Sequence, residues 1–244
     1  MRGLFEQVLD SVGLAICAGT APAVLTAQEV EESTGASRSV VREAARVLET
    51  LGMVRPVKRV GLVVQEASRW NALDPRVIRW NLASPRRDAQ VRQLLQLRVA
   101  IEPEAARLAA QRAGSPEADP PSGLADAAAN LVASDAEAFG ERDALFHRAV
   151  LEASGNDMFV RLADVITEAL RERAASVAHA DPHDVALHAA LAEQILAGSA
   201  DAAAHTARDI VTRTAADTAR GRGPAGAGGS GGSGGSGGPE GRRP

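Results

Sequence analysis

The stretch ASRSVVREAARVLETLGMV, residues 36–54, decides the fold of the amino-terminal part of this chain. Ser37 is a favourable N-cap residue, because its hydroxyl can accept a hydrogen bond from an amide of the first helical turn. Apolar residues then recur at intervals of three and four, which predicts an amphipathic helix: Val41, Ala44, Ala45, Val47, Leu48 and Leu51. Gly52 ends this helix.

Two further helices are predicted upstream of this stretch. Apolar residues at helical spacing run from Leu4 to Ile16, which predicts the first helix. Thr26 and Glu29 have the spacing of a capping box, in which each side chain accepts a hydrogen bond from the amide of the other residue. The short helix that they open stops at Gly35, where the chain bends.

Two extended segments, 53–57 and 62–65, are predicted downstream, with a turn at 58–61 between them. Pro56 confines the first segment to a sheet edge, because proline cannot donate a hydrogen bond to a neighbouring strand. Three helices followed by a two-stranded ribbon are the order of a winged helix-turn-helix, whose last helix enters the DNA major groove.

The predicted DNA-contacting residues lie at the start of this recognition helix, along it, and in the turn of the wing: Ser37, Arg38, Ser39, Arg42, Arg46, Lys58, Arg59 and Gly61. Arginine can bind a guanine edge with two hydrogen bonds, and serine hydroxyls suit phosphates. Residues 35–60 carry a net charge of +4, whereas residues 1–34 carry −4. From spacing alone an ordinary helical hairpin with a solvated arginine stripe stays open as an alternative.

The rest of the chain is predicted to be helical, which makes the fold mainly α. We divide it into a DNA-binding domain (1–67), a connector (68–88) in which Asp74 and Pro75 start a short helix, an all-helical bundle (89–220) and a tail (221–244). Breaks at 114–123, 134–135, 155–156, 181–182 and 198 give about six helices in the bundle. The tail holds 12 of the 23 glycines and is expected to be flexible and dispensable.

Composition excludes several classes of protein. The six aromatic residues are too few for base-stacking surfaces. The single cysteine excludes disulfide scaffolds and cysteine-rich zinc modules. The chain has no apolar run of about 18 residues and no signal-peptide pattern, so we expect a cytoplasmic protein without a membrane partner.

Residues 36–54 resemble the signature of the GntR family of bacterial transcription regulators, a small residue followed by Ser-Arg-x-x-Val-Arg-Glu-Ala and then Leu-Glu-x-x-Gly-Leu-Val. Gly61 falls at the wing glycine of that family. The chain departs from the family at Val40, where proline is frequent, and at Gln28, where some members have a base-contacting arginine. These two departures bear on the operator sequence.

The second half resembles the all-helical FCD effector domain of the FadR subfamily. Residues 97–110, LRVAIEPEAARLAA, are similar to its first helix, and residues 143–156, DALFHRAVLEASGN, to its most recognisable motif. The connector WNALDPRVIRW, residues 70–80, is similar to that of members that control sugar-acid catabolism. The resemblance implies effector-binding roles for Arg98 and Asn156.

Asp143 and His147 are four residues apart on one predicted helix, so both project from the same face. With His188 they form a carboxylate and two imidazoles, a set that suits a divalent ion, with zinc expected first and nickel or manganese as alternatives. The resemblance implies a fourth ligand, a histidine, where this chain has Ile210. Either a register shift brings Asp209 into the site, or water or the effector completes it.

Other readings of these residues stay open at this point. Asp143 and His147 could form a surface pair, with His188, like His179 and His183, exposed to solvent. We interpret Glu102 as an ordinary helical glutamate.

The leading functional prediction is therefore a DNA-binding transcription regulator, a repressor rather than an enzyme. It would be a homodimer on an inverted-repeat operator, and a small carboxylate metabolite, such as a sugar acid, would shift the population of its two arrangements. One alternative is a metal-dependent hydrolase that uses Asp143, His147 and His188. Another is a helical protein-interaction module.

Overall fold

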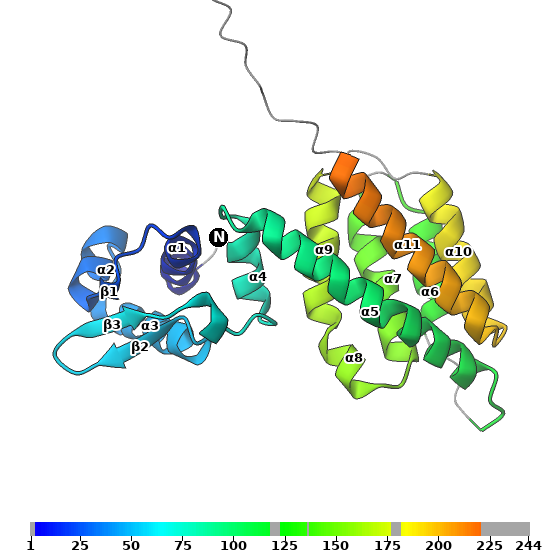
Figure 1. The fold of residues 1–244 in the computed structure, drawn as a ribbon, viewed down its shortest axis with the longest axis horizontal. Coiled ribbons are helices and arrows are strands. Elements are labelled where there is room, and N and C mark those ends of the chain that lie inside the picture. Colours follow the sequence, from blue (N-terminus) through cyan, green and yellow to red (C-terminus); the bar gives the residue numbers. More distant parts are fainter. Residues whose placement is uncertain (1–2, 118–122, 136, 177–181, 221–244) are drawn as a thin grey trace, which may run out of the picture.

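The computed structural model describes residues 3–117, 123–135, 137–176 and 182–220. Figure 1 shows two halves side by side, with α4 (Pro75–Leu82) between them. The predicted tail, 221–244, lies outside the described residues. Within the described ranges, no helix is both long enough and apolar enough to span a bilayer.

The amino-terminal half is a winged helix-turn-helix, as predicted. Its elements are α1 (Leu4–Ala18), β1 (Val24–Leu25), α2 (Ala27–Thr34), α3 (Arg38–Thr50), β2 (Val54–Val57) and β3 (Gly61–Val64). The strands pair antiparallel in the order β1-β3-β2, with Arg55 opposite Val63 and Leu25 opposite Leu62. The edge position of β2 confirms the expectation from Pro56.

Local signals fix the ends of these helices. The Thr26 hydroxyl accepts from the Glu29 amide at 3.2 Å, and the Thr26 amide donates to the Glu29 carboxylate at 2.8 Å, so the capping box is confirmed. Gly35 adopts the left-handed region, with φ of 68°, at the bend between α2 and α3. Ser37 occupies the N-cap of α3, but its hydroxyl pairs with Ser39 Oγ at 3.0 Å rather than with an amide.

The core of this half lies where α1 crosses α3, and the wing and α4 close it. Its buried members are Val8, Leu9, Val12, Ile16, Cys17, Leu25, Val30, Ala36, Val41, Ala44, Leu48, Leu51, Met53, Val54, Val77 and Trp80. The last two residues come from α4, so the connector helix is part of the DNA-binding core.

Helix α4 begins as predicted, because Asp74 accepts from the Arg76 amide at 2.8 Å and Pro75 occupies the first turn. The face of α4 opposite Val77 and Trp80 carries Ile78 and Leu82, which are buried in a second core with residues of the carboxyl-terminal half. The Arg79 guanidinium also donates to Glu168 of the carboxyl-terminal half at 2.8 Å. The connector therefore packs against both halves.

The carboxyl-terminal half is an all-helical bundle. Its helices are α5 (Arg87–Ala113), α6 (Leu124–Val132), α7 (Phe139–Ala153), α8 (Asp157–Arg161), α9 (Ala163–Ser176), α10 (Pro182–Leu196) and α11 (Ala200–Arg220). Figure 1 shows α5 crossing the bundle, with α11 alongside it. Helix α7 packs against α5, α6 and α9, which places it inside the bundle.

The structure differs from the sequence prediction in three details. Residues Val24–Leu25 form the strand β1, which was not predicted. A break at Leu162 separates α8 from α9, so the described part of the bundle has seven helices rather than six. The strands β2 and β3 begin one residue later and one residue earlier, respectively, than expected.

Candidate metal centre and DNA-binding surface

Three side chains with metal-ligating atoms converge inside the bundle. Asp143 and His147 come from α7 and His188 from α10, and one ligand atom of each lies within 4.8 Å of the others. Asp143 Oδ1 lies 3.4 Å from His147 Nε2 and 3.0 Å from His188 Nε2, and the two Nε2 atoms are 3.3 Å apart.

All three side chains are buried, so the alternative of a solvent-exposed pair is wrong for this set. Phe146, on α7, packs edge-on against both imidazole rings. Its ring centroid lies 5.8 Å from that of His147 and 5.2 Å from that of His188. His179 and the side chain of His183 lie outside the described residues.

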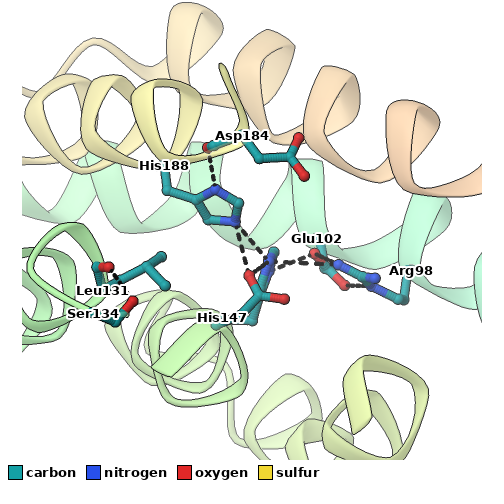
Figure 2. Close-up of polar contacts among 8 residues, drawn as sticks. Arg98, Glu102, Leu131, Ser134, His147, Asp184 and His188 are labelled. Carbon is teal, nitrogen blue, oxygen red and sulfur yellow. Dashed lines mark hydrogen bonds and ion pairs between the residues drawn. The ribbon is translucent and has the colours of Figure 1, made fainter. Parts of the chain in front are cut away.

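Each imidazole is oriented by a hydrogen bond at its other nitrogen, as Figure 2 shows. His188 Nδ1 lies 2.6 Å from the Asp184 carbonyl oxygen, and His147 Nδ1 lies 2.8 Å from Glu102 Oε2. A carbonyl oxygen and an ionised carboxylate only accept, so both Nδ1 atoms are donors. In the neutral rings both Nε2 lone pairs then point toward each other and toward Asp143, which is the orientation of metal-ligating histidines.

The spacing of these three atoms suits a divalent ion. Metal–ligand bonds of about 2.0–2.1 Å in a tetrahedral arrangement separate ligand atoms by about 3.3 Å. The three observed separations, 3.0, 3.3 and 3.4 Å, lie close to this value. Two neutral imidazoles and one carboxylate also form a donor set for zinc and other transition metals. The residues present therefore fit the ion that the sequence predicted.

Glu102 and Arg98, both on α5, extend this cluster. The Arg98 guanidinium donates to Glu102 through Nε at 2.5 Å and Nη2 at 3.3 Å, and its Nη2 lies 3.5 Å from His147 Nε2. Arg98, which the sequence analysis assigned to effector binding, lies next to this cluster, and only 1% of its surface is exposed. The interpretation of Glu102 as an ordinary helical glutamate is wrong, because it bonds two members of the cluster.

Electrostatics keep the cluster ionised despite its burial. Burial disfavours the charged carboxylate of Glu102, but Arg98 and His147 outweigh it and lower the pKa of Glu102 to about 2. Burial likewise opposes charge on Asp143, yet its contacts with His147 and His188 hold its pKa well below the usual range. Burial alone would lower the pKa of His147, but Glu102 and Asp143 raise it to about 9. Near pH 7 the metal-free ring of His147 therefore carries a proton on Nε2 as well as on Nδ1, and a metal ion would displace the proton on Nε2.

Among the described residues, the cluster contains none of the other residues considered for the site. Ile210 is fully buried in the apolar core of the bundle, so the position of the expected fourth histidine holds a hydrocarbon side chain. Asp209 does not enter the site; it pairs on the surface with His205 at 3.5 Å, and the register-shift prediction is wrong. Asn156 is the N-cap of α8, where its side chain accepts from the Met158 amide at 3.0 Å. This hydrogen bond is local to α8 and is not a contact with the cluster.

The predicted DNA-contacting residues form an exposed surface at the other end of the molecule. Seven of the eight are exposed, on the start and outer side of α3 and on the turn between β2 and β3, whereas Gly61 is half-buried. Arg59 adopts a left-handed conformation, with φ of 64°, which makes the turn tight. Arg46 pairs with Glu43 of its own helix at 3.5 Å.

Comparison with known proteins identifies the family. Residues 93–213 match the FCD domain. The chain is 30% identical over 177 residues to the helix-turn-helix transcriptional regulator YieP of Escherichia coli K12, which covers 72% of this chain and 76% of YieP. It is 32% identical over 144 residues, 59% of this chain, to the galactonate operon transcriptional repressor of the same organism, 62% of which is covered.

A solved structure of Lar, which controls the agr system of Listeria monocytogenes, shares the fold with a TM-score of 0.58 at 15% identity, over 90% of this chain and 98% of that one. The relatives are transcription regulators, so neither the hydrolase nor the interaction-module alternative holds, and the chain is not an enzyme. This chain belongs to the GntR family of helix-turn-helix transcription regulators, in the group that carries an FCD domain.

Proposed function

We propose that this regulator is a repressor whose operator binding responds to a small carboxylate metabolite bound next to a divalent metal ion in the FCD domain. The observation that carries the proposal is the convergence of Asp143 Oδ1, His147 Nε2 and His188 Nε2, with both Nδ1 atoms held by acceptors. The similarity to a repressor of a galactonate operon supports both the sign of regulation and a sugar acid as effector.

Asp143, His147 and His188 would hold the ion, with zinc the first expectation and nickel or manganese the alternatives. The ion would supply a positive charge and coordination positions that protein side chains do not fill, because Ile210 replaces a fourth ligand. The side chains of Arg98, Glu102 and Asp143 carry one net negative charge, so a divalent ion with neutral imidazoles leaves one net positive charge. A buried positive site attracts a carboxylate.

The DNA-binding part of the proposal rests on α3 and the wing. The exposed side chains of Ser37, Arg38, Ser39 and Arg42 at the start of α3 would enter the major groove, with Arg46 further along. Lys58, Arg59 and Gly61 would lie against the neighbouring backbone. We propose a homodimer in the cytoplasm on an inverted-repeat operator, because two-fold symmetry in DNA is matched by two-fold symmetry in the protein.

We propose residues 1–67 as the DNA-binding domain, 68–88 as the connector and 89–220 as the effector domain. Arg98 would bind the effector carboxylate, and Asn156 at the start of α8 is the second candidate contact. Regulation requires that the ligand bind one arrangement of the two domains more tightly than the other. Helix α4, which contributes to both cores, is the element through which the two arrangements would differ.

The test combines elemental analysis with operator binding. Protein purified without chelator is expected to carry about one divalent ion per chain, whereas His147→Ala is expected to lose it. Operator affinity is then measured by fluorescence anisotropy with a panel of sugar acids that includes galactonate. His205→Ala is the matched control, because His205 is 76% exposed and lies outside the cluster.

The expected result is that wild type and His205→Ala bind metal and release the operator with one member of the panel. His147→Ala should still bind the operator, because its DNA-binding half is unchanged, but should not respond to the ligand. Absence of metal from wild-type protein, with no rise in melting temperature on adding zinc, nickel or manganese, would refute the metal site.

A further inference from the structure

Glu102 is the one residue of the described cluster that bonds both Arg98 and His147. Its Oε1 accepts from Arg98 Nε at 2.5 Å, and its Oε2 accepts from His147 Nδ1 at 2.8 Å and from Arg98 Nη2 at 3.3 Å. Only 3% of the surface of Glu102 is exposed. Both of its oxygens are therefore used as acceptors inside the protein, as Figure 2 shows.

We propose that Glu102 is a positioning residue: by accepting from Nδ1 it keeps a proton of His147 there, so that Nε2 is the nitrogen that faces a metal and releases its proton to it. The metal part of this inference rests on the proposed function, but the placement of the proton does not. Asp184 performs the same task for His188 with its backbone carbonyl, which no substitution removes.

The substitution Glu102→Gln is expected to move the proton of the neutral His147 ring from Nδ1 to Nε2. Glutamine keeps the shape of glutamate but replaces one acceptor oxygen by an NH₂ donor. Arginine is always protonated and only donates. Arg98 contacts both positions, through Nε at 2.5 Å and Nη2 at 3.3 Å, so the glutamine oxygen is expected to face the closer donor, Nε. The NH₂ group then faces His147 Nδ1 and requires Nδ1 to accept, which moves the ring proton to Nε2. A protonated Nε2 cannot bind a metal.

The first experiment measures the proton directly in metal-free protein at pH 10, above the His147 pKa of about 9, where most of the rings are neutral and carry one proton. In a long-range ¹H–¹⁵N spectrum of histidine-labelled protein, with His147 assigned from a His147→Gln variant, we expect a protonated Nδ1 in wild type. In Glu102→Gln we expect an unprotonated Nδ1. Glu104→Gln is the matched control, because Glu104 lies on the same helix and pairs with Arg107 at 2.9 Å on the surface, and it should match wild type.

The second experiment measures zinc affinity by competition with a chelator. Loss of a hydrogen-bond partner of a ligating histidine typically weakens metal binding by about 10- to 100-fold, and we expect this loss in Glu102→Gln. Adding Arg98→Met should restore most of the affinity, because the glutamine oxygen is then free to turn to His147. A residue that only stabilises the fold would not be rescued by the loss of a second buried partner.

A further pair of variants keeps the test decisive if Glu102→Gln does not fold. Arg98→Met with Glu102→Gln retains an acceptor for His147 Nδ1, whereas Arg98→Met with Glu102→Met has none, and both lack the buried ion pair. The first should bind zinc at least about 10-fold more tightly than the second.

Equal zinc affinity in that pair, or a protonated Nδ1 in folded Glu102→Gln, would overturn the proposal. If wild-type protein binds no metal but the proton moves as described, the proposed function fails and the role of Glu102 stands.

Discussion

Replacing Gly13 by alanine tests the packing between the DNA-binding core and the connector helix. Gly13 lies inside α1, and a Cβ atom there would lie 2.6 Å from three atoms of the Trp80 ring on α4. Trp80 is buried, and its indole N–H donates to Asp10 Oδ1 at 2.9 Å. The ring must therefore move by about 1 Å to admit a methyl group, because carbon atoms in contact are about 3.5–4.0 Å apart.

Two opposing effects set the expected free energy of unfolding. Alanine is favoured over glycine inside a helix by about 1 kcal/mol. Overpacking a core costs about 1–3 kcal/mol, and a hydrogen bond to a charged group contributes about 1.5–3 kcal/mol, part of which is lost as the indole moves. We expect a net destabilisation of about 1–3 kcal/mol, which for a chain of this size lowers the melting temperature by about 3–10 °C.

The assay is thermal unfolding followed by far-ultraviolet circular dichroism. Gly3→Ala is the control, because nothing lies within 4 Å of a Cβ at that position. In a Trp80→Leu background the steric term should vanish, so Gly13→Ala should be neutral or stabilising there. A higher melting temperature for Gly13→Ala in the wild-type background would show that helix propensity dominates and would refute the packing argument.

Two more predictions concern the DNA-binding half. Arg38→Ala should weaken operator binding by about 1–3 kcal/mol and relax the preference at one base pair per half-site. Arg42→Ala should weaken binding to all sequences and reduce the salt dependence of the affinity. Anisotropy titrations that are unchanged in both variants would show that α3 does not bind in the major groove. Burial raises the pKa of the Cys17 thiol to about 11, against a smaller opposing effect of Arg86. At pH 8 native protein should therefore react with a thiol reagent at least about 100-fold more slowly than unfolded protein, and equal rates would contradict the packed core around α1.

Much of the fold of the amino-terminal half was predictable because several helix boundaries have a local chemical cause. Thr26 and Glu29 cap α2 with each other, and Asp74 with Pro75 starts α4. Such signals act within one helical turn, so they are visible without knowledge of the tertiary structure. The strand β1 has no local cause: it is two residues long and exists because it pairs with β3.

The three residues of the candidate metal centre were predictable for a similar reason. Asp143 and His147 are four residues apart on one helix, and this spacing alone places them together. His188 is 41 residues from His147, and only the resemblance to FCD domains linked it to them. The sequence already shows that Ile210 carries no ligating atom, but only the structure shows that Asp209 pairs with His205 instead of entering the site.

The role of Glu102 could not be predicted from the sequence. Helix α5 packs against α4, α7, α9, α10 and α11, so its surroundings bury residues on several sides. In such a helix an apolar stripe does not distinguish buried from exposed positions. Glu102 and Glu104 are two residues apart in the same helix, yet the first is fully enclosed and the second is about half exposed. The available signal was the spacing of Arg98 and Glu102, four residues apart, which also occurs in exposed ion pairs.

The connector helix explains why the two halves of this regulator cannot move independently at low cost. Neighbouring residues of α4 enter different cores, Val77 and Trp80 that of the DNA-binding half and Ile78 that of the bundle. A shift of α4 relative to either half exposes apolar surface or opens a cavity, and losses of this kind cost several kcal/mol in a packed core. A ligand therefore changes the arrangement only if its preference for one state exceeds that cost, or if both arrangements are well packed. The Gly13→Ala variant on α1 and the Trp80→Leu variant on α4 alter only the contact between α4 and the DNA-binding half, so they measure how much of that cost belongs to this contact.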